Sequence, residues 1–174
     1  NLTKHHAPMQ DAQRAVSMVR SRASEWKIDP KRIGFMGFSA GGHLTAAVVT
    51  SDGTVTFPKE DVDEASPIPD FSLLIYPAYL KSAEDSNKLV DEVSVDEKTP
   101  PAFVVIAHGD SRFVEGAVIY YLAMQRAKCQ CELHVYGKGG HGYGMKEIPE
   151  RVGEWTTQAA GWMKEMGLLE PALK

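Results

Sequence analysis

The chain has 174 residues, of which 43% are hydrophobic and 24% are charged, and its formal net charge is -4. This length allows one domain with a sizeable core, and the acidic balance disfavours nucleic acid or an anionic membrane as a partner. No apolar run reaches the roughly 18 residues that a membrane-spanning helix needs. The first residues hold neither an initiator methionine nor an apolar signal segment, so we expect the sequence to start inside a longer protein of undetermined compartment.

Helices and short strands are predicted to alternate along the chain. Residues 10–26 carry apolar side chains at helical spacing. Residues 32–38 are apolar on both faces and bounded by turns, which indicates a buried parallel strand. A helix at 40–50 and a polar loop at 51–70, with at most one helical turn, come next. The other predicted elements are a strand at 71–79, a strand at 102–107, a helix at 115–128, a strand at 132–136, a glycine-rich loop at 137–145 and a helix at 148–166. The charged segment at 81–99, here called the excursion, connects the strands at 71–79 and 102–107.

This order of elements predicts a single α/β domain over residues 1–174, with a mostly parallel sheet and helices on both of its faces. The strand at 32–38 would then lie at an edge of the sheet. Proteins normally cover an apolar, uncharged edge because it invites aggregation. We therefore expect this strand to pair with a neighbour that the chain does not contain, or with a second copy in a homo-oligomer.

The pentapeptide Gly37-Phe38-Ser39-Ala40-Gly41 fits the G-x-S-x-G nucleophile elbow and lies between a predicted strand and a predicted helix. Such a turn strains the backbone of the serine, and we expect side chains two residues away on either side to clash, which favours glycine at both places. The following helix N-terminus offers N–H groups to an oxyanion. We predict Ser39 as the nucleophile and the Ala40 N–H as an oxyanion-hole donor. The alternative is a glycine-rich turn with an N-cap serine.

A serine hydroxyl needs a base within hydrogen-bond reach. His141 is the best candidate, because its glycine-rich loop directly follows the last predicted strand and can bend back over the edge of the sheet. The remaining histidines are predicted to be terminal (His5 and His6), packing or surface (His43), structural (His134), or at the border of the pocket (His108).

The acid that orients this base is expected at the end of an intervening strand. Asp110 follows the strand at 102–107, which gives the chain order Ser39, Asp110, His141 that α/β hydrolases share. Other carboxylates fit less well: Asp85, Asp91 and Asp96 lie in the excursion, and Asp70 would face the opposite edge of the sheet.

Several motifs occur in one order along the chain. They are Gln10-Asp11-Ala12-Gln13-Arg14-Ala15, Ile28-Asp29-Pro30-Lys31-Arg32-Ile33-Gly34, Gly37-Phe38-Ser39-Ala40-Gly41-Gly42-His43-Leu44, Tyr120-Tyr121-Leu122-Ala123, Glu132-Leu133-His134-Val135-Tyr136 and Gly139-Gly140-His141-Gly142-Tyr143-Gly144. Over most of residues 8–165 the chain resembles the acetyl-esterase and xylan-esterase-like α/β hydrolases, the BD-FAE/Aes-like group.

The resemblance implies the α/β-hydrolase fold and a carboxylic-ester hydrolase for short acyl groups, often acetyl esters of plant polysaccharides, that uses no metal and no organic cofactor. It places the nucleophile on Ser39 and the histidine on His141. Counting back from residues 120–123 places the acid on Asp110, whereas a shift of one residue would place it on Ser111. Members of the group carry about 100 further residues in front, with an H-G-G-type loop that supplies the other oxyanion N–H groups, so the chain is expected to be the C-terminal portion, without the N-terminal strands.

Two alternatives stay open. A serine peptidase of the prolyl-oligopeptidase type shares the fold and the residue order. The second alternative is an inactive, truncated hydrolase that associates through its exposed strand edge.

Overall fold

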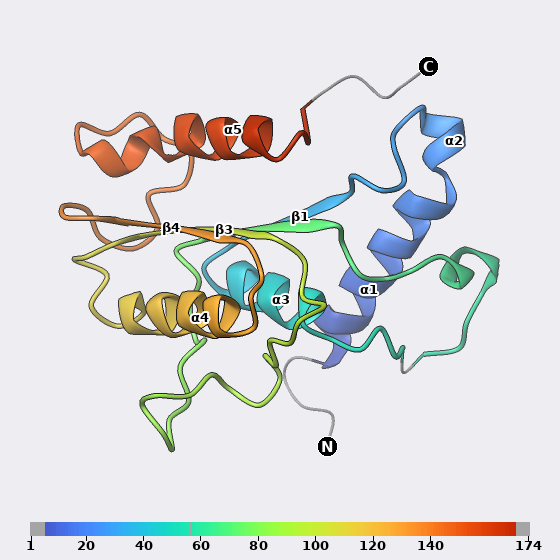
Figure 1. Ribbon diagram of the computed structural model, residues 1–174, viewed down its shortest axis with the longest axis horizontal. Helices are drawn as coiled ribbons and strands as arrows, with labels where there is room; N and C mark the ends of the chain where they lie inside the picture. Colours follow the sequence, from blue (N-terminus) through green and yellow to red (C-terminus); the bar gives the residue numbers. More distant parts are fainter. Residues whose placement is uncertain (1–5, 56, 170–174) are drawn as a thin grey trace.

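The computed structural model describes residues 6–55 and 57–169 and contains a four-stranded parallel sheet in the order β1-β2-β3-β4 (Figure 1). Its strands are β1 (Gly34–Phe38), β2 (Phe71–Ile75), β3 (Ala102–Ala107) and β4 (Cys131–Tyr136). Each strand pairs in parallel with the next one in the sequence. This confirms the predicted parallel sheet.

Helices cover both faces of this sheet, as predicted. Helix α5 lies over one face, and α1, α3 and α4 lie over the other (Figure 1). The helices are α1 (His6–Ser21), α2 (Ala23–Trp26), α3 (Ala40–Val49), α4 (Val114–Arg126) and α5 (Trp155–Glu165), with short 3-10 helices at η1 (Asp61–Glu64) and η2 (Arg151–Glu154). Among the described residues, no helix combines the length and the apolar character that crossing a membrane requires.

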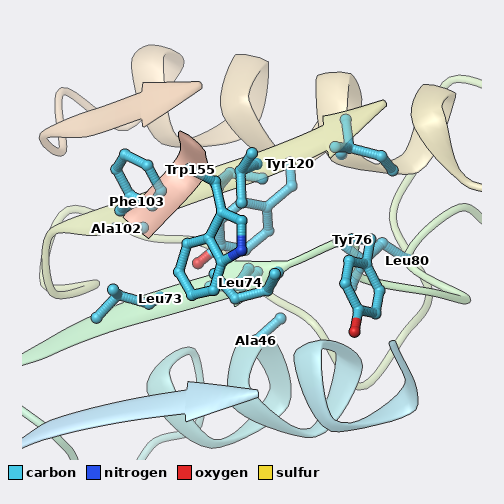
Figure 2. Packing of buried hydrophobic residues seen from close by; sticks show 14 of the residues in the cluster. Ala46, Leu73, Leu74, Tyr76, Leu80, Ala102, Phe103, Tyr120 and Trp155 are labelled. Atoms are coloured by element: carbon cyan, nitrogen blue, oxygen red, sulfur yellow. The ribbon is translucent and has the colours of Figure 1, made fainter. Parts of the chain in front are cut away.

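The core lies on both sides of β3, whose six residues are all buried. Tyr120 and Met124 of α4 are fully buried in this core. From α5, Trp162 packs against Phe103 of β3 with ring centroids 5.9 Å apart, and Trp155 lies over the same sheet (Figure 2). Each large apolar side chain removed from water in this way contributes about 1.5–3 kcal/mol to folding.

The ends of several predicted elements differ in the structure, and three of these differences are the largest. The helix predicted at 10–26 is interrupted at Arg22, which separates α1 from α2. The strand predicted at 71–79 stops at Ile75, because Tyr76 has a φ of 39° and the following Pro77 has no N–H for a ladder bond. The last helix begins as a 3-10 turn at Arg151 rather than at residue 148.

β1 lies at an edge of the described sheet, as expected, but the prediction that it is buried was wrong. The side chain of Met36 is 47% exposed, and Gly34 is exposed as well. Two residues beyond Met36 along the strand, the ring of Phe38 packs against Trp155 of α5 at 6.0 Å. Since side chains two apart share a face of a strand, the cover from α5 reaches Phe38 and leaves Met36 open.

Two arginines of α1 fasten the helix to the segment between α3 and β2. Arg14 Nη2 donates to Asp63 Oδ2 at 2.8 Å, and the side chain of Asp63 is fully buried. Arg20 Nη2 donates to Asp70 Oδ2 at 2.7 Å, and the same oxygen accepts from the Ile33 N–H at 2.8 Å. These bonds fix α1 beside the start of the β1–β2 pair.

Candidate active site

The carboxyl ends of the four parallel strands meet at one edge of the sheet, where α/β folds bind ligands. Ser39 follows β1 and Tyr76 follows β2. Asp110 comes shortly after β3, and His141 lies in the loop after β4. The residues predicted from the sequence as nucleophile, acid and base therefore share one edge.

The backbone of Ser39 is held in a strained conformation, with φ 55° and ψ -117°. Non-glycine residues rarely adopt a positive φ, and such strain persists only when the surroundings determine it. Here the Ser39 N–H donates to the Ile75 carbonyl at 3.0 Å, while the Ser39 carbonyl accepts from the N–H groups of Gly42 and Ala78 at 2.9 and 3.0 Å. These bonds hold the turn between β1 and α3.

The elbow needs glycine at Gly37 but has room at Gly41. A Cβ at Gly37 would lie 1.9 Å from the Gly41 carbonyl oxygen, which no side chain tolerates. A Cβ at Gly42 would lie 2.8 Å from Pro77 Cα. Apart from its chain neighbours and the backbone of α3 itself, no described atom lies within 4 Å of a Cβ built at Gly41. The prediction that both flanking glycines avoid a clash was therefore right for Gly37 and wrong for Gly41.

Ser39, His141 and Asp110 form a continuous chain of short contacts. Ser39 Oγ lies 2.7 Å from His141 Nε2, and His141 Nδ1 lies 2.6 Å from Asp110 Oδ2. The Asp110 side chain is only 4% exposed, whereas that of His141 is 34% exposed. With the ring proton on Nδ1, the imidazole donates to the carboxylate and Nε2 accepts from the serine hydroxyl. Such an arrangement can draw the proton away from Ser39 Oγ.

Two loops bring Asp110 and His141 together. The Asp110 carbonyl accepts from the N–H groups of Phe113 and Val114, both at 3.0 Å, which places the carboxylate directly before α4. In the neighbouring loop, the Gly139 carbonyl lies so close to Gly109 that a Cβ there would be 2.3 Å away. The glycines around both residues thus allow a close approach of the two backbones.

Aromatic rings flank the imidazole of His141. The ring of Tyr76 lies 5.0 Å from it edge-on, and that of Phe113 lies 5.1 Å away. Tyr143 packs against Tyr76 at 4.5 Å and donates from its hydroxyl to the Val105 carbonyl at 3.3 Å. Burial raises the pKa of Tyr76, which the backbone of Gly144 partly offsets. Tyr76 and Phe113 were not predicted from the sequence, although Tyr76 directly follows β2 and Phe113 directly precedes α4 at this edge.

A cavity of about 570 Å³ opens beside the nucleophile elbow. Ala40, the first residue of α3, lines it together with Gly41, and the opposite wall comes from α1. The first N–H groups of a helix have no acceptor within the helix. The Ala40 N–H, directly after Ser39, is therefore placed to donate to a group that enters from this cavity.

The other histidines lie apart from this chain of contacts. His43 is buried, and its Nε2 lies 3.1 Å from a carboxylate oxygen of Glu92. His134 Nε2 lies 2.6 Å from Glu132 Oε1 on β4, and His108 is exposed at the end of β3. His6 lines the cavity, and His5 lies outside the described residues. The described part of the chain holds no group of three or more His, Cys, Asp or Glu residues that could bind a metal ion.

The BD-FAE family model matches residues 2–67. The fold is similar to the crystal structure of an acetyl ester-xyloside bifunctional hydrolase from Caldicellulosiruptor lactoaceticus, with 32% sequence identity and a TM-score of 0.84. That match covers 96% of this chain and 68% of the other. The chain belongs to the BD-FAE and acetylxylan esterase group of α/β hydrolases.

Two curated proteins related to this BD-FAE-group chain come from bacteria. An acetylxylan esterase of Xylanibacter ruminicola is 29% identical over 91% of this chain and 36% of its own length. The endo-1,4-beta-xylanase B of Butyrivibrio fibrisolvens is 28% identical over 79% of this chain and 25% of its own length. The chain thus spans about a third or less of the curated relatives that it matches.

Proposed function

We propose that the protein hydrolyses carboxylic esters with short acyl groups, acetyl above all, with Ser39 as its nucleophile. The observation that carries this proposal is the chain of contacts from Ser39 Oγ through His141 to the buried Asp110 carboxylate, at 2.7 and 2.6 Å. It lies at the strand ends beside a cavity, where an α/β fold receives its ligands. Family membership supports the same chemistry.

In the proposed first half-reaction, Ser39 Oγ attacks the acyl carbon while His141 Nε2 takes the hydroxyl proton. Asp110 stabilises the imidazolium that forms, and the Ala40 N–H donates to the tetrahedral oxyanion. When this intermediate collapses, His141 returns the proton to the departing alcohol. Water then attacks the acyl-serine while His141 takes a proton from it, the bond between the acyl carbon and Ser39 Oγ breaks, and His141 returns the proton to Ser39 as the carboxylic acid leaves.

The alcohol side of the substrate is proposed to be a carbohydrate. Relatives of the chain are named as an acetylxylan esterase and as an acetyl ester-xyloside hydrolase. The cavity beside Ala40, of about 570 Å³, is much larger than an acetyl group needs. Acetylated plant polysaccharides are therefore the proposed natural substrates.

Acid release in a pH-stat tests the reaction class. Acetylated xylo-oligosaccharides and ethyl acetate are compared with Gly-Pro amide, for wild type, His141→Ala and the matched control His134→Ala; cleavage of the amide is followed by chromatography, because it releases no net acid near neutral pH. We expect ester hydrolysis that falls about 10⁴-fold or more in His141→Ala and persists in His134→Ala, whose ring lies on β4 beside Glu132. Cleavage of the amide without the esters would replace the proposal with a peptidase.

The exposed edge of β1 favours a second candidate, an inactive hydrolase that self-associates. Met36 on that strand is 47% exposed, and open strand edges pair with other chains. Sedimentation velocity over a range of concentrations separates the two candidates when combined with the acid-release assay. A dimer without ester hydrolysis would favour the second candidate, and ester hydrolysis by a monomer would remove it.

A further inference from the structure

Tyr79 is an exposed aromatic residue in an unusual backbone conformation. Its side chain is 50% exposed, and its φ is 57°. A bulky residue rarely adopts a positive φ, and such outliers cluster at sites that bind ligands or perform chemistry. Tyr79 is not buried in the core, and it lines the cavity beside Ala40 and Gly41.

The surroundings of Tyr79 connect it to both the nucleophile and the base. The N–H of the preceding Ala78 donates to the Ser39 carbonyl at 3.0 Å. On the other side, the ring of Tyr79 meets Phe113 edge-on at 5.1 Å, and Phe113 lies 5.1 Å from the His141 ring. Tyr79 therefore lies on the His141 side of the candidate site, one ring away from the imidazole.

The positively charged side chain of Arg112 lies close to the Tyr79 ring. The guanidinium of Arg112 lies 5.8 Å from the Tyr79 ring centroid and 5.3 Å from that of Phe113. Arg112 is exposed, so its N–H donors are accessible from solvent. The flat apolar ring of Tyr79 thus lies beside the N–H donors of the Arg112 guanidinium.

We propose that Tyr79 and Arg112 form a subsite for a sugar ring on the alcohol side of the ester. A pyranose combines apolar C–H faces, which pack on an aromatic ring, with hydroxyl groups, which accept from a guanidinium. The departing alcohol has to receive its proton from His141, so its sugar lies on the His141 side, where Phe113 and Tyr79 are. This inference rests on the proposed ester hydrolysis at Ser39.

The test compares two acetate esters with different alcohols. Acid release gives kcat/KM for acetylated xylotetraose and for ethyl acetate, whose alcohol is too small to reach Tyr79, and their ratio cancels effects common to both. The variants are Tyr79→Ala, the ring-retaining Tyr79→Trp, and Arg112→Ala. Trp26→Ala is the matched control, because Trp26 is a similarly exposed aromatic residue (44%) in α2, before β1, whereas Ser39 follows β1 (Figure 1).

We expect the ratio to fall about tenfold in Tyr79→Ala, the size of a lost aromatic contact, and to recover in Tyr79→Trp. Arg112→Ala should lower it as well, and Trp26→Ala should leave it unchanged. An equal loss on both esters, or no loss, would overturn the subsite.

Failure of the proposed function has a different signature, in which wild type releases acid from neither ester. Calorimetric titration with xylotetraose then decides the subsite by itself. Binding by wild type that is lost in Tyr79→Ala supports the subsite, and absence of binding by wild type overturns it.

Discussion

Asp110 is the buried end of the chain of contacts that begins at Ser39. Its side chain is 4% exposed and lies 2.6 Å from His141 Nδ1. An amide in this place offers an N–H where the imidazole needs an acceptor, which favours the wrong ring tautomer.

Asp110→Asn is therefore expected to lower kcat on 4-nitrophenyl acetate about 10⁴-fold without unfolding the protein. Stopped-flow or steady-state release of nitrophenol measures the rate, and circular dichroism checks the fold. Asp85→Asn, in the excursion after β2, is the control and should keep its rate. A loss below tenfold in Asp110→Asn would contradict the assigned role of Asp110.

The two glycines that flank the serine differ in what they tolerate. A Cβ at Gly37 would meet the Gly41 carbonyl oxygen at 1.9 Å, whereas a Cβ at Gly41 would meet no described atom within 4 Å outside its chain neighbours and the backbone of α3.

Gly37→Ala should lower the free energy of unfolding by about 3 kcal/mol, because backbone has to move. Gly41→Ala should leave it unchanged or raise it by about 0.5–1 kcal/mol, since alanine favours a helix. Urea unfolding measures both values. Equal destabilisation by the two substitutions would be at odds with the described elbow.

At the level of the elements, one of the carboxylates that hold α1 is fully buried. Asp63 is fully buried and accepts from Arg14 Nη2 at 2.8 Å and from the Glu60 N–H at 2.9 Å. Removing a charged partner leaves a buried charge that water does not reach.

Arg14→Ala is expected to lower the free energy of unfolding by about 2 kcal/mol or more. Arg22→Ala is the control, because Arg22 is exposed between α1 and α2, and it should change stability by less than about 0.5 kcal/mol. Urea unfolding of the two variants side by side gives the comparison. Similar free energies of unfolding for the two variants would mean that the contact of Arg14 with Asp63 contributes nothing to stability.

The sequence predicts the elements well and their ends less well. The six residues of β3 coincide with the predicted strand because its apolar run is bounded by proline and by His108-Gly109. The strand that became β2 was predicted four residues too long. A run of apolar letters continues through Tyr76, but the positive φ there turns the backbone out of the sheet. That turn is fixed by contacts with Ser39, which lies far away in the sequence.

At the scale of the whole molecule, burial makes the fold sensitive to alkali. It raises the pKa of the Cys131 thiol to about 12, and it also raises the pKa values of the Tyr120 and Tyr143 phenols. Below their ordinary pKa values these groups are protonated in the folded and the unfolded chain alike. Above those values only the folded chain keeps the protons, so ionisation stabilises the unfolded chain and stability falls as the pH rises.

The free energy of unfolding should therefore stay level up to about pH 9 and then fall by up to about 1.4 kcal/mol per pH unit for each such group. Tyr120→Phe removes the fully buried phenol and should make the decline shallower. Urea unfolding between neutral and alkaline pH measures the slope. A flat profile through the alkaline range would rule out this linkage.

Chain order predicts which residues share the site, because the ends of parallel strands meet at one edge. Ser39, Asp110 and His141 were predicted in this way, and the structure brings them within hydrogen-bond distance. Their catalytic roles remain predictions. The rings of Tyr76, Tyr79 and Phe113 were not predicted, because their contacts depend on how loops pack and no local pattern encodes that packing.

Reaction with a fluorophosphonate probe, followed by mass spectrometry of the adduct, is the direct test of Ser39 as an activated nucleophile. We expect one adduct, on Ser39, with the labelling lost in His141→Ala and kept in His134→Ala. No adduct on Ser39 in the folded protein, or labelling of Ser39 that is unaffected by His141→Ala, would contradict it.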